Sequence, residues 1–114
     1  MSNIILFTDR YRYFLYGGSA DMRKSFAGLC GIVINEMHMT ITDNDIFVFL
    51  NKDKTHMKIL LHEHNGFTML YRKLDKGRFD LLMQEGGNNA VALNASDLLS
   101  ILKGLSFHKY RQYT

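Results

Sequence analysis

The pattern of apolar and polar positions predicts strands and helices along most of the chain. Aromatic residues dominate Tyr11 to Tyr16, and this run stops at Gly17-Gly18, which predicts a strand followed by a turn. Farther along, apolar residues recur at spacings of three and four, typical of one face of an amphipathic helix: Met22, Phe26, Leu29, Val33 and Met37. We therefore expect a long helix after the first strand.

The middle of the chain predicts a buried strand followed by a hairpin. Residues Ile46 to Leu50 are apolar on both faces of a pleated strand, as expected of a central strand. The runs His56 to His62 and Phe67 to Lys73 flank Asn65-Gly66, a dipeptide typical of tight hairpin turns. The segment therefore supplies three neighbouring strands.

The hairpin turn also predicts a register. If Asn65 and Gly66 are the two turn residues, Lys58 lies opposite Lys73 and Leu60 lies opposite Tyr71 on one face. The other face is then the natural core face and carries Ile59, Leu61, Leu70 and Arg72.

The remaining segments complete the predicted fold. Ala90 to Leu93 is a short candidate strand, and Asn94 or Ser96 is positioned to cap a helix that Gly104 ends. We expect an α+β fold, an antiparallel β-meander packed on one face by one long N-terminal helix and a short C-terminal helix. Residues 1–114 are expected to form a single domain, with its core at about 11–107 and a polar tail at 108–114.

Composition restricts the class of protein. The chain has 114 residues, a formal charge of +3 and 46% hydrophobic residues, which favours a folded, mildly basic globular protein. Its one cysteine, Cys30, excludes an internal disulfide and suits the reducing cytoplasm. Ile4 to Phe7 is too short an apolar stretch for a membrane span or an export signal, so we expect a cytoplasmic protein that does not contact membranes.

Two short basic runs lie beside glycine-bearing turns. In the first, Arg23 and Lys24 follow Gly17-Gly18 at the expected start of the helix, where free N–H groups attract phosphate. Cations there oppose the helix dipole, and a bound phosphate would reverse that cost. The alternative is purely local, with Asp21 capping the helix and pairing with Arg23 or Lys24.

The second basic run, from Tyr71 to Phe79, begins in the second arm of the hairpin and continues beyond it. In the predicted register Lys58 and Lys73 form a like-charge pair beside Tyr71 on the face away from the core. Cations that alternate with an aromatic ring suit distorted or single-stranded nucleic acid. The alternative is that both lysines extend into solvent and that Tyr71 is a half-buried sheet residue.

No set of residues predicts catalysis, a cofactor or a metal site. The imidazoles of His62 and His64 would share one strand face, but a third ligand at a suitable spacing is missing. Cys30 lies in the predicted helix and is expected to be a small buried apolar residue. The acidic residues are scattered over loops and caps, so no acid/base pair or two-metal site can be placed.

An ordered set of short motifs resembles one protein family. The motifs are Asp21-Met22-Arg23-Lys24-Ser25 with Gly28-Leu29, Ile46-Phe47-Val48-Phe49, Lys58-Ile59-Leu60, Asn65-Gly66-Phe67, Leu70-Tyr71-Arg72-Lys73-Leu74, Lys76-Gly77-Arg78-Phe79, Leu93 through Leu98, and Leu102 with Gly104-Leu105. They run from about Tyr13 to Phe107 and resemble the TnpB-type accessory protein, the product of the second open reading frame of IS sixty-six type bacterial insertion sequences.

This resemblance implies a mobile-element protein that assists a separate DDE transposase and does not cut DNA itself. The chain departs from the family pattern at several positions. Leu61-His62 replaces a tryptophan pair, and Asn51-Lys52-Asp53-Lys54 replaces an arginine-rich turn. The family also tends to have an acid near the position of Lys103 and a tryptophan at that of Phe107. The added acid in the turn weakens any phosphate contact there, and the lost tryptophans leave Tyr71 and Phe67 as substitutes for stacking.

Our hypothesis from the sequence is a non-catalytic accessory factor for DNA transposition that binds DNA at insertion-sequence ends, the transposase, or both. The predicted stacking residue is Tyr71, and the predicted phosphate contacts are Arg23, Lys24, Lys58, Arg72, Lys73, Lys76 and Arg78. The alternative is an interaction or homo-oligomerisation module without DNA contact, with an exposed apolar patch of Leu60, Phe67 and Met69.

Overall fold

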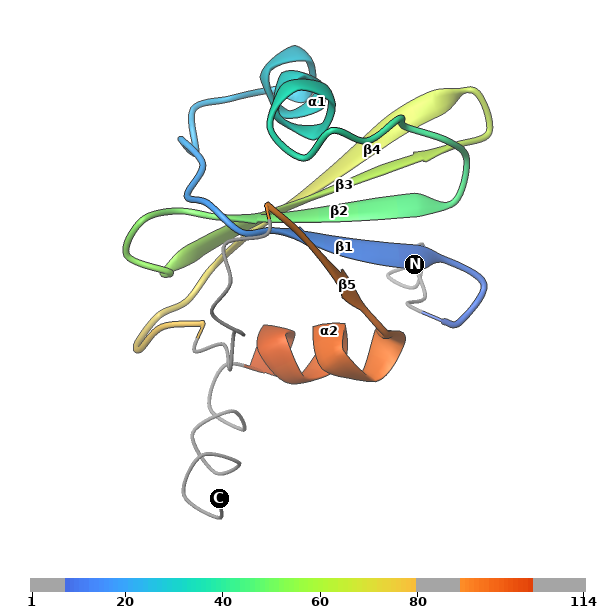
Figure 1. Cartoon of the computed structure of the whole chain (residues 1–114). Helices are drawn as coiled ribbons and strands as arrows, with labels where there is room; N and C mark the ends of the chain where they lie inside the picture. Colours follow the sequence, from blue (N-terminus) through green and yellow to red (C-terminus); the bar gives the residue numbers. More distant parts are fainter. Residues whose placement is uncertain (1–7, 80–88, 104–114) are drawn as a thin grey trace.

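A mixed five-stranded sheet with one helix on each face forms the fold (Figure 1). The computed structural model describes residues 8–79 and 89–103. Its elements are β1 (Arg12–Tyr16), α1 (Phe26–Asn35), β2 (Asp45–Leu50), β3 (His56–Glu63), β4 (Gly66–Lys73), β5 (Ala90–Leu93) and α2 (Ala95–Lys103). The strand order is β4-β3-β2-β1-β5, in which β1 and β2 are parallel and the other neighbours are antiparallel.

This arrangement corrects the predicted antiparallel meander with both helices on one face. The chain crosses from β1 through α1 and returns as the parallel neighbour β2, while the described β5 lies on the far side of β1. The strand β2 explains why two helical layers are needed, because all six of its residues are buried. A strand that is apolar on both faces requires cover on both faces.

Two separate hydrophobic clusters fill the space between the sheet and the helices. On the α2 face, Leu98 and Ile101 pack with the inward side chains of the sheet, including Val48, Ile59 and Leu61. On the α1 face, Leu29 and Val33 pack on Phe47, Phe49 and Leu60. Burial of one such large apolar side chain contributes about 1.5–3 kcal/mol, so both layers stabilise the sheet.

The N-terminal helix is shorter than the apolar spacing predicts. It begins at Phe26, because the Ser25 hydroxyl accepts the Phe26 N–H at 2.6 Å as the N-cap, and it spans ten residues. The helix is viewed nearly end-on in Figure 1 while the strands run across the picture, so α1 crosses the strands. Its start lies near β4, with the Phe26 and Phe67 rings 6.1 Å apart, and the Glu36 carbonyl after its end accepts the Asn89 amide at 3.1 Å.

The hairpin forms as predicted but with a different turn. His64 and Asn65 are the two turn residues, with φ of 53° and 62°, the left-handed conformation of the tight turns that join antiparallel strands. Gly66 is the first residue of β4 and pairs with Glu63. The partners therefore shift by two positions, which keeps every side chain on its predicted face.

The prediction for the C-terminal part is confirmed where the structure describes it. The strand at Ala90–Leu93 forms at the sheet edge, and Asn94 caps the helix that follows. The Asn94 side chain accepts the Asp97 N–H at 2.7 Å, and the Asp97 carboxylate accepts the Asn94 N–H at 3.1 Å. The predicted stop at Gly104 and the tail at 108–114 lie outside the described residues. Neither described helix has the length and apolar character needed to cross a membrane.

Candidate functional site

Six cationic residues lie around one end of the sheet, which we call the basic end. At this end β1, β2 and β4 finish and β3 begins, since Leu50 pairs with Met57 and His56 pairs with Lys73. The cations of the basic end lie in the β2–β3 turn, in the last two positions of β4 and in the segment after β4: Lys52, Lys54, Arg72, Lys73, Lys76 and Arg78.

Backbone contacts hold these segments together. The Leu74 N–H donates to the Thr55 carbonyl at 3.0 Å, and the Phe79 N–H donates to the Lys54 carbonyl at 2.7 Å. The Phe79 side chain is fully buried in the cluster on the α2 face. The segment after β4 is therefore fixed against the β2–β3 turn, which brings Lys76 and Arg78 to the same end as Lys52 and Lys54.

The charges of the basic end are largely uncompensated. Its two segments carry only the acids Asp53 and Asp75. Among residues 8–79 and 89–103, none of the six cations has a carboxylate within 4.0 Å of its charged nitrogens. At the opposite end, by contrast, Arg12 pairs with Asp45 at 2.7 Å, and Arg10 lies 3.9 Å from Glu63. Arg10 and Arg12, at the opposite end, thus have carboxylate partners that the six cations of the basic end lack among the described residues.

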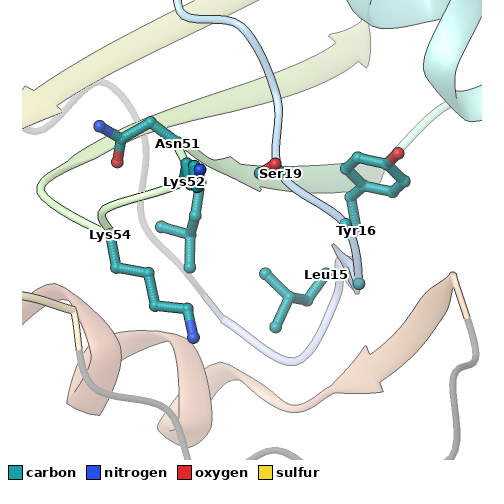
Figure 2. A pocket seen from close by; sticks show the side chains of 9 residues that line it. Leu15, Tyr16, Ser19, Asn51, Lys52 and Lys54 are labelled. Atoms are coloured by element: carbon teal, nitrogen blue, oxygen red, sulfur yellow. The ribbon is translucent and has the colours of Figure 1, made fainter.

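A pocket of about 250 Å³ opens at this end, beside the finishing points of the parallel strands (Figure 2). Its wall combines the Gly17-Gly18-Ser19 loop with the β2–β3 turn, and the Lys54 side chain extends along it toward the side of α2. The loop is fixed by the Gly17 N–H to Asn89 carbonyl bond of 2.9 Å and the Ala20 N–H to Leu50 carbonyl bond of 2.8 Å. The carboxyl ends of parallel strands are a usual place for ligands in open sheets.

Glycine at position 18 leaves room in this loop for a close aromatic neighbour. A Cβ at this position would lie 2.7 Å from the ring of Tyr16. The absence of a side chain lets the loop pass close to that ring. Glycine here therefore accommodates the Tyr16 ring, and the lysines of the β2–β3 turn are the neighbouring cations.

The structure places Arg23 and Lys24 before the helix rather than in its first turn. The Asp21 carboxylate accepts the Arg23 N–H at 2.9 Å and contacts the guanidinium at 2.7 Å. These bonds lower the pKa of Asp21 and raise that of Arg23. The local alternative is thus correct for the pairing, whereas Ser25 caps the helix in place of Asp21.

Lys58 is buried and serves the fold. Its Nζ donates to the carbonyl of Lys24, just before α1, at 2.6 Å, and the ammonium is 5.2 Å from the centre of the Tyr71 ring. The predicted pair of Lys58 with Lys73 is wrong, because Lys58 lies opposite Tyr71 and Lys73 lies opposite His56. The one-residue shift of the turn, which moves the strand partners by two positions, is the physical reason.

The predicted apolar patch is only partly exposed. Leu60 is fully buried in the cluster beneath α1, so it is unavailable to a partner. Phe67 is 41% exposed and packs against Phe26, and Met69 is half-buried. Tyr71 is 58% exposed with His56 and Lys58 beside its ring. Helix α1 covers β3 on the face that the sequence left open, and β4 remains accessible.

Lys52 and Lys54 are candidate contacts that the sequence did not single out. The acid in their turn predicts a weaker phosphate contact than the family pattern does, yet both lysines line the pocket at the carboxyl ends of the parallel strands. Their position in the sequence could have indicated this role, because they directly follow a strand that is apolar on both faces. Such a strand is central in a sheet, and ligands often bind at the carboxyl ends of central parallel strands.

The described residues contain no metal-binding cluster of three or more His, Cys, Asp or Glu side chains. His62 instead contacts Asp43, with Nδ1 and Oδ1 2.8 Å apart, and His64 lies in the hairpin turn. Partial burial raises the pKa of Cys30, which disfavours a reactive thiolate.

Comparison with known proteins identifies similar chains. A family model described as "IS66 Orf2 like protein" matches residues 11–112. An uncharacterized protein of Sinorhizobium fredii, y4hO, is 28% identical over 96 residues, which cover 84% of this chain and 82% of that protein. No solved structure matches.

Proposed function

The chain belongs to the IS66 Orf2-like family, whose role is accessory to transposition, and from this premise we propose that its basic end binds the phosphate backbone of DNA. In this proposal the protein is non-catalytic and acts in the bacterial cytoplasm, where it assists a separate transposase at the ends of the insertion sequence. The contacts are made by Lys52, Lys54, Arg72, Lys73, Lys76 and Arg78.

The observation that carries this proposal is the gathering of uncompensated cations from two chain segments at one end of the sheet, where Lys52 and Lys54 also line an open pocket. Unpaired lysine and arginine side chains held on a rigid scaffold attract a polyanion, and each phosphate contact releases counterions. The segments are fixed to one another by backbone bonds and by the buried Phe79, so the charges are positioned before DNA arrives. Preorganisation of this kind reduces the entropy lost on binding.

Arg23, Lys24 and Tyr71 have lesser roles in the proposal. The Arg23 charge is already paired with Asp21, so a phosphate would have to compete with that carboxylate. The Lys24 side chain is exposed. Its backbone carbonyl accepts the hydrogen bond from the Lys58 ammonium, so the two residues lie close together. Tyr71 presents an exposed ring beside Lys73 on β4, on which an unpaired base could stack.

Fluorescence anisotropy with labelled insertion-sequence-end DNA at several salt concentrations tests the proposal. Each phosphate contact contributes about 0.9 to the slope of log K against log salt. The double variant Lys52→Ala/Lys54→Ala should therefore lower the slope by about 1.8 if both side chains contact phosphates. Lys76→Ala/Arg78→Ala should act similarly.

The matched control is Arg10→Ala, which removes one positive charge from the opposite end, where the guanidinium already lies near Glu63. We expect its salt slope to equal that of the wild type. The proposal fails if the wild type does not bind DNA at low salt, or if removal of Arg10 weakens binding as much as removal of a basic-end lysine. In that case the alternative of an interaction module without DNA contact gains support.

A further inference from the structure

The outer edge of β4 is an eight-residue strand edge that no other described strand covers. Seven of the eight residues are exposed, and Phe67, Leu70 and Tyr71 are among the large apolar side chains most open to solvent. Soluble proteins usually protect such an edge, since its unpaired N–H and C=O groups recruit another strand. We propose that β4 pairs with β4 of a second copy of this chain, forming a two-fold dimer with a continuous antiparallel sheet.

The hydrogen-bond pattern of the hairpin shows which backbone groups are free. Leu74 donates its N–H inward to Thr55, and alternate residues of a strand point the same way. Leu70 and Arg72 therefore bond to β3, whereas Phe67, Met69 and Tyr71 direct their N–H and C=O groups outward. A second antiparallel strand can bond to this outward set.

Two-fold symmetry limits the register of a self-paired strand. The axis is perpendicular to the sheet, so residues that face one another across it lie on the same face and differ by an even number of positions. When the axis passes Met69, Met69 faces its own copy, and Phe67 faces Tyr71 of the second copy. Both aromatic side chains are exposed in the monomer, and cross-strand aromatic pairs are stabilising.

Charge complementarity favours this same register. Arg72 of one copy then lies opposite Gly66 of the other, and Gly66 is the neighbour of Glu63 on β3. A Cβ at Gly66 would have no heavy atom within 4 Å, so the Arg72 side chain can pass over it. Two strand spacings are about 9.6 Å, a distance that the arginine and glutamate side chains can span together.

The carboxylate is held ready for this contact. Tyr11 donates its hydroxyl to Glu63 Oε1 at 3.2 Å, and the exposed Arg10 guanidinium lies 3.9 Å from the same oxygen, so the acid is fixed at the end of the sheet away from the basic end. The two-fold axis repeats the contact between Arg72 and Glu63, so the dimer contains it twice. A strand of an unrelated protein would have to reproduce both the aromatic row and the cation, whereas a second copy supplies both. The two basic ends would then face opposite ways, and one dimer could contact two DNA segments, a consequence that rests on the proposed function.

Cysteine cross-linking tests the register directly. In a Cys30→Ser background, Met69→Cys should form an intermolecular disulfide under mild oxidation, because paired Cα atoms lie about 5.5 Å apart across such a ladder. Thr68→Cys is the matched control on the same strand, since its two copies would be roughly 8 Å apart, beyond disulfide reach. Leu70→Cys cross-linking in preference to Met69→Cys would contradict the register.

Sedimentation velocity on the wild-type chain measures the association itself without DNA. We expect a dimer whose dissociation constant rises at least tenfold in Arg72→Glu, which brings two acids together at each end of the paired strands. Lys73→Glu makes the same charge change on the other face of β4 and should have a smaller effect. A wild type that stays monomeric up to its solubility limit, with no Met69→Cys cross-link, overturns the proposal and leaves the edge to a strand of another protein.

Discussion

Replacement of Lys58 by methionine separates a structural role from a DNA-binding role. The sequence placed this lysine on an exposed face as a phosphate contact, but the structure buries it, with 8% of its surface exposed. Methionine retains the length and apolar character of the stem and removes only the ammonium. Lys58→Met therefore removes the 2.6 Å bond to the Lys24 carbonyl and the contact with the Tyr71 ring.

The magnitude follows from these two contacts. A hydrogen bond from a charged donor contributes about 1.5–3 kcal/mol, and a cation–π contact adds about 0.5–1 kcal/mol. The variant also avoids the cost of keeping an ammonium away from water, and water can reach the exposed segment around Lys24. We therefore expect Lys58→Met to lower the free energy of unfolding by about 1–2 kcal/mol.

Urea denaturation followed by circular dichroism measures this loss, and anisotropy measures DNA binding of the same variant. The salt slope of DNA binding should be unchanged, since a buried ammonium contacts no phosphate. Lys73→Met is the matched control on the exposed strand and should change stability by less than about 0.5 kcal/mol. A Lys58→Met protein with wild-type stability and a salt slope lower by about 0.9 would refute the structural role.

Three further predictions concern the fold. Asn94→Ala removes the N-cap that accepts the Asp97 N–H and should lower the free energy of unfolding by about 1 kcal/mol, measured by urea denaturation. Leu29→Ala leaves a cavity in the fully buried cluster under α1 and should cost about 2–5 kcal/mol, measured in the same way. Burial raises the pKa of Tyr13 to about 12, so the unfolded chain loses this proton first as the pH rises above 10. Stability should therefore fall between pH 10 and 12, and Tyr13→Phe should make the fall shallower in urea midpoints taken across that range.

Local order along the chain was predictable from the sequence. The aromatic run before Gly17-Gly18, the doubly apolar Ile46 to Leu50 segment and the two arms of the hairpin all form strands near their predicted positions. The Asn94 cap and the helix after it also follow from residue types alone. These features depend on neighbours within a few residues, where side-chain periodicity and backbone preference act directly.

The turn of the hairpin shows where local reasoning reaches its limit. Asn65-Gly66 is a strong turn dipeptide, yet His64 and Asn65 adopt the left-handed conformation and Gly66 enters the strand. The shift lets Leu60 lie opposite Met69 and His62 lie opposite Phe67. Only packing of the finished sheet, including the Phe26 ring against Phe67, distinguishes the two registers.

The candidate site was predictable in composition but not in arrangement. Lys76 and Arg78 were chosen for their charge, whereas their closeness to Lys52 and Lys54 depends on the backbone bonds between Phe79 and Lys54 and between Leu74 and Thr55. Lys58 is equally basic, but its burial and its bond to the Lys24 carbonyl give it a structural role. Charge is a property of each residue, while exposure depends on what packs above it.

The sequence by itself determined the strands, the C-terminal helix and the family, because each rests on residue types at fixed spacings. The tertiary structure decided the strand order, the face that each helix covers and the gathering of free cations at one end of the sheet. The physical reason is that the parallel β1–β2 pair and its helical crossover depend on burying both faces of β2 at once, a constraint that involves residues far apart in the chain.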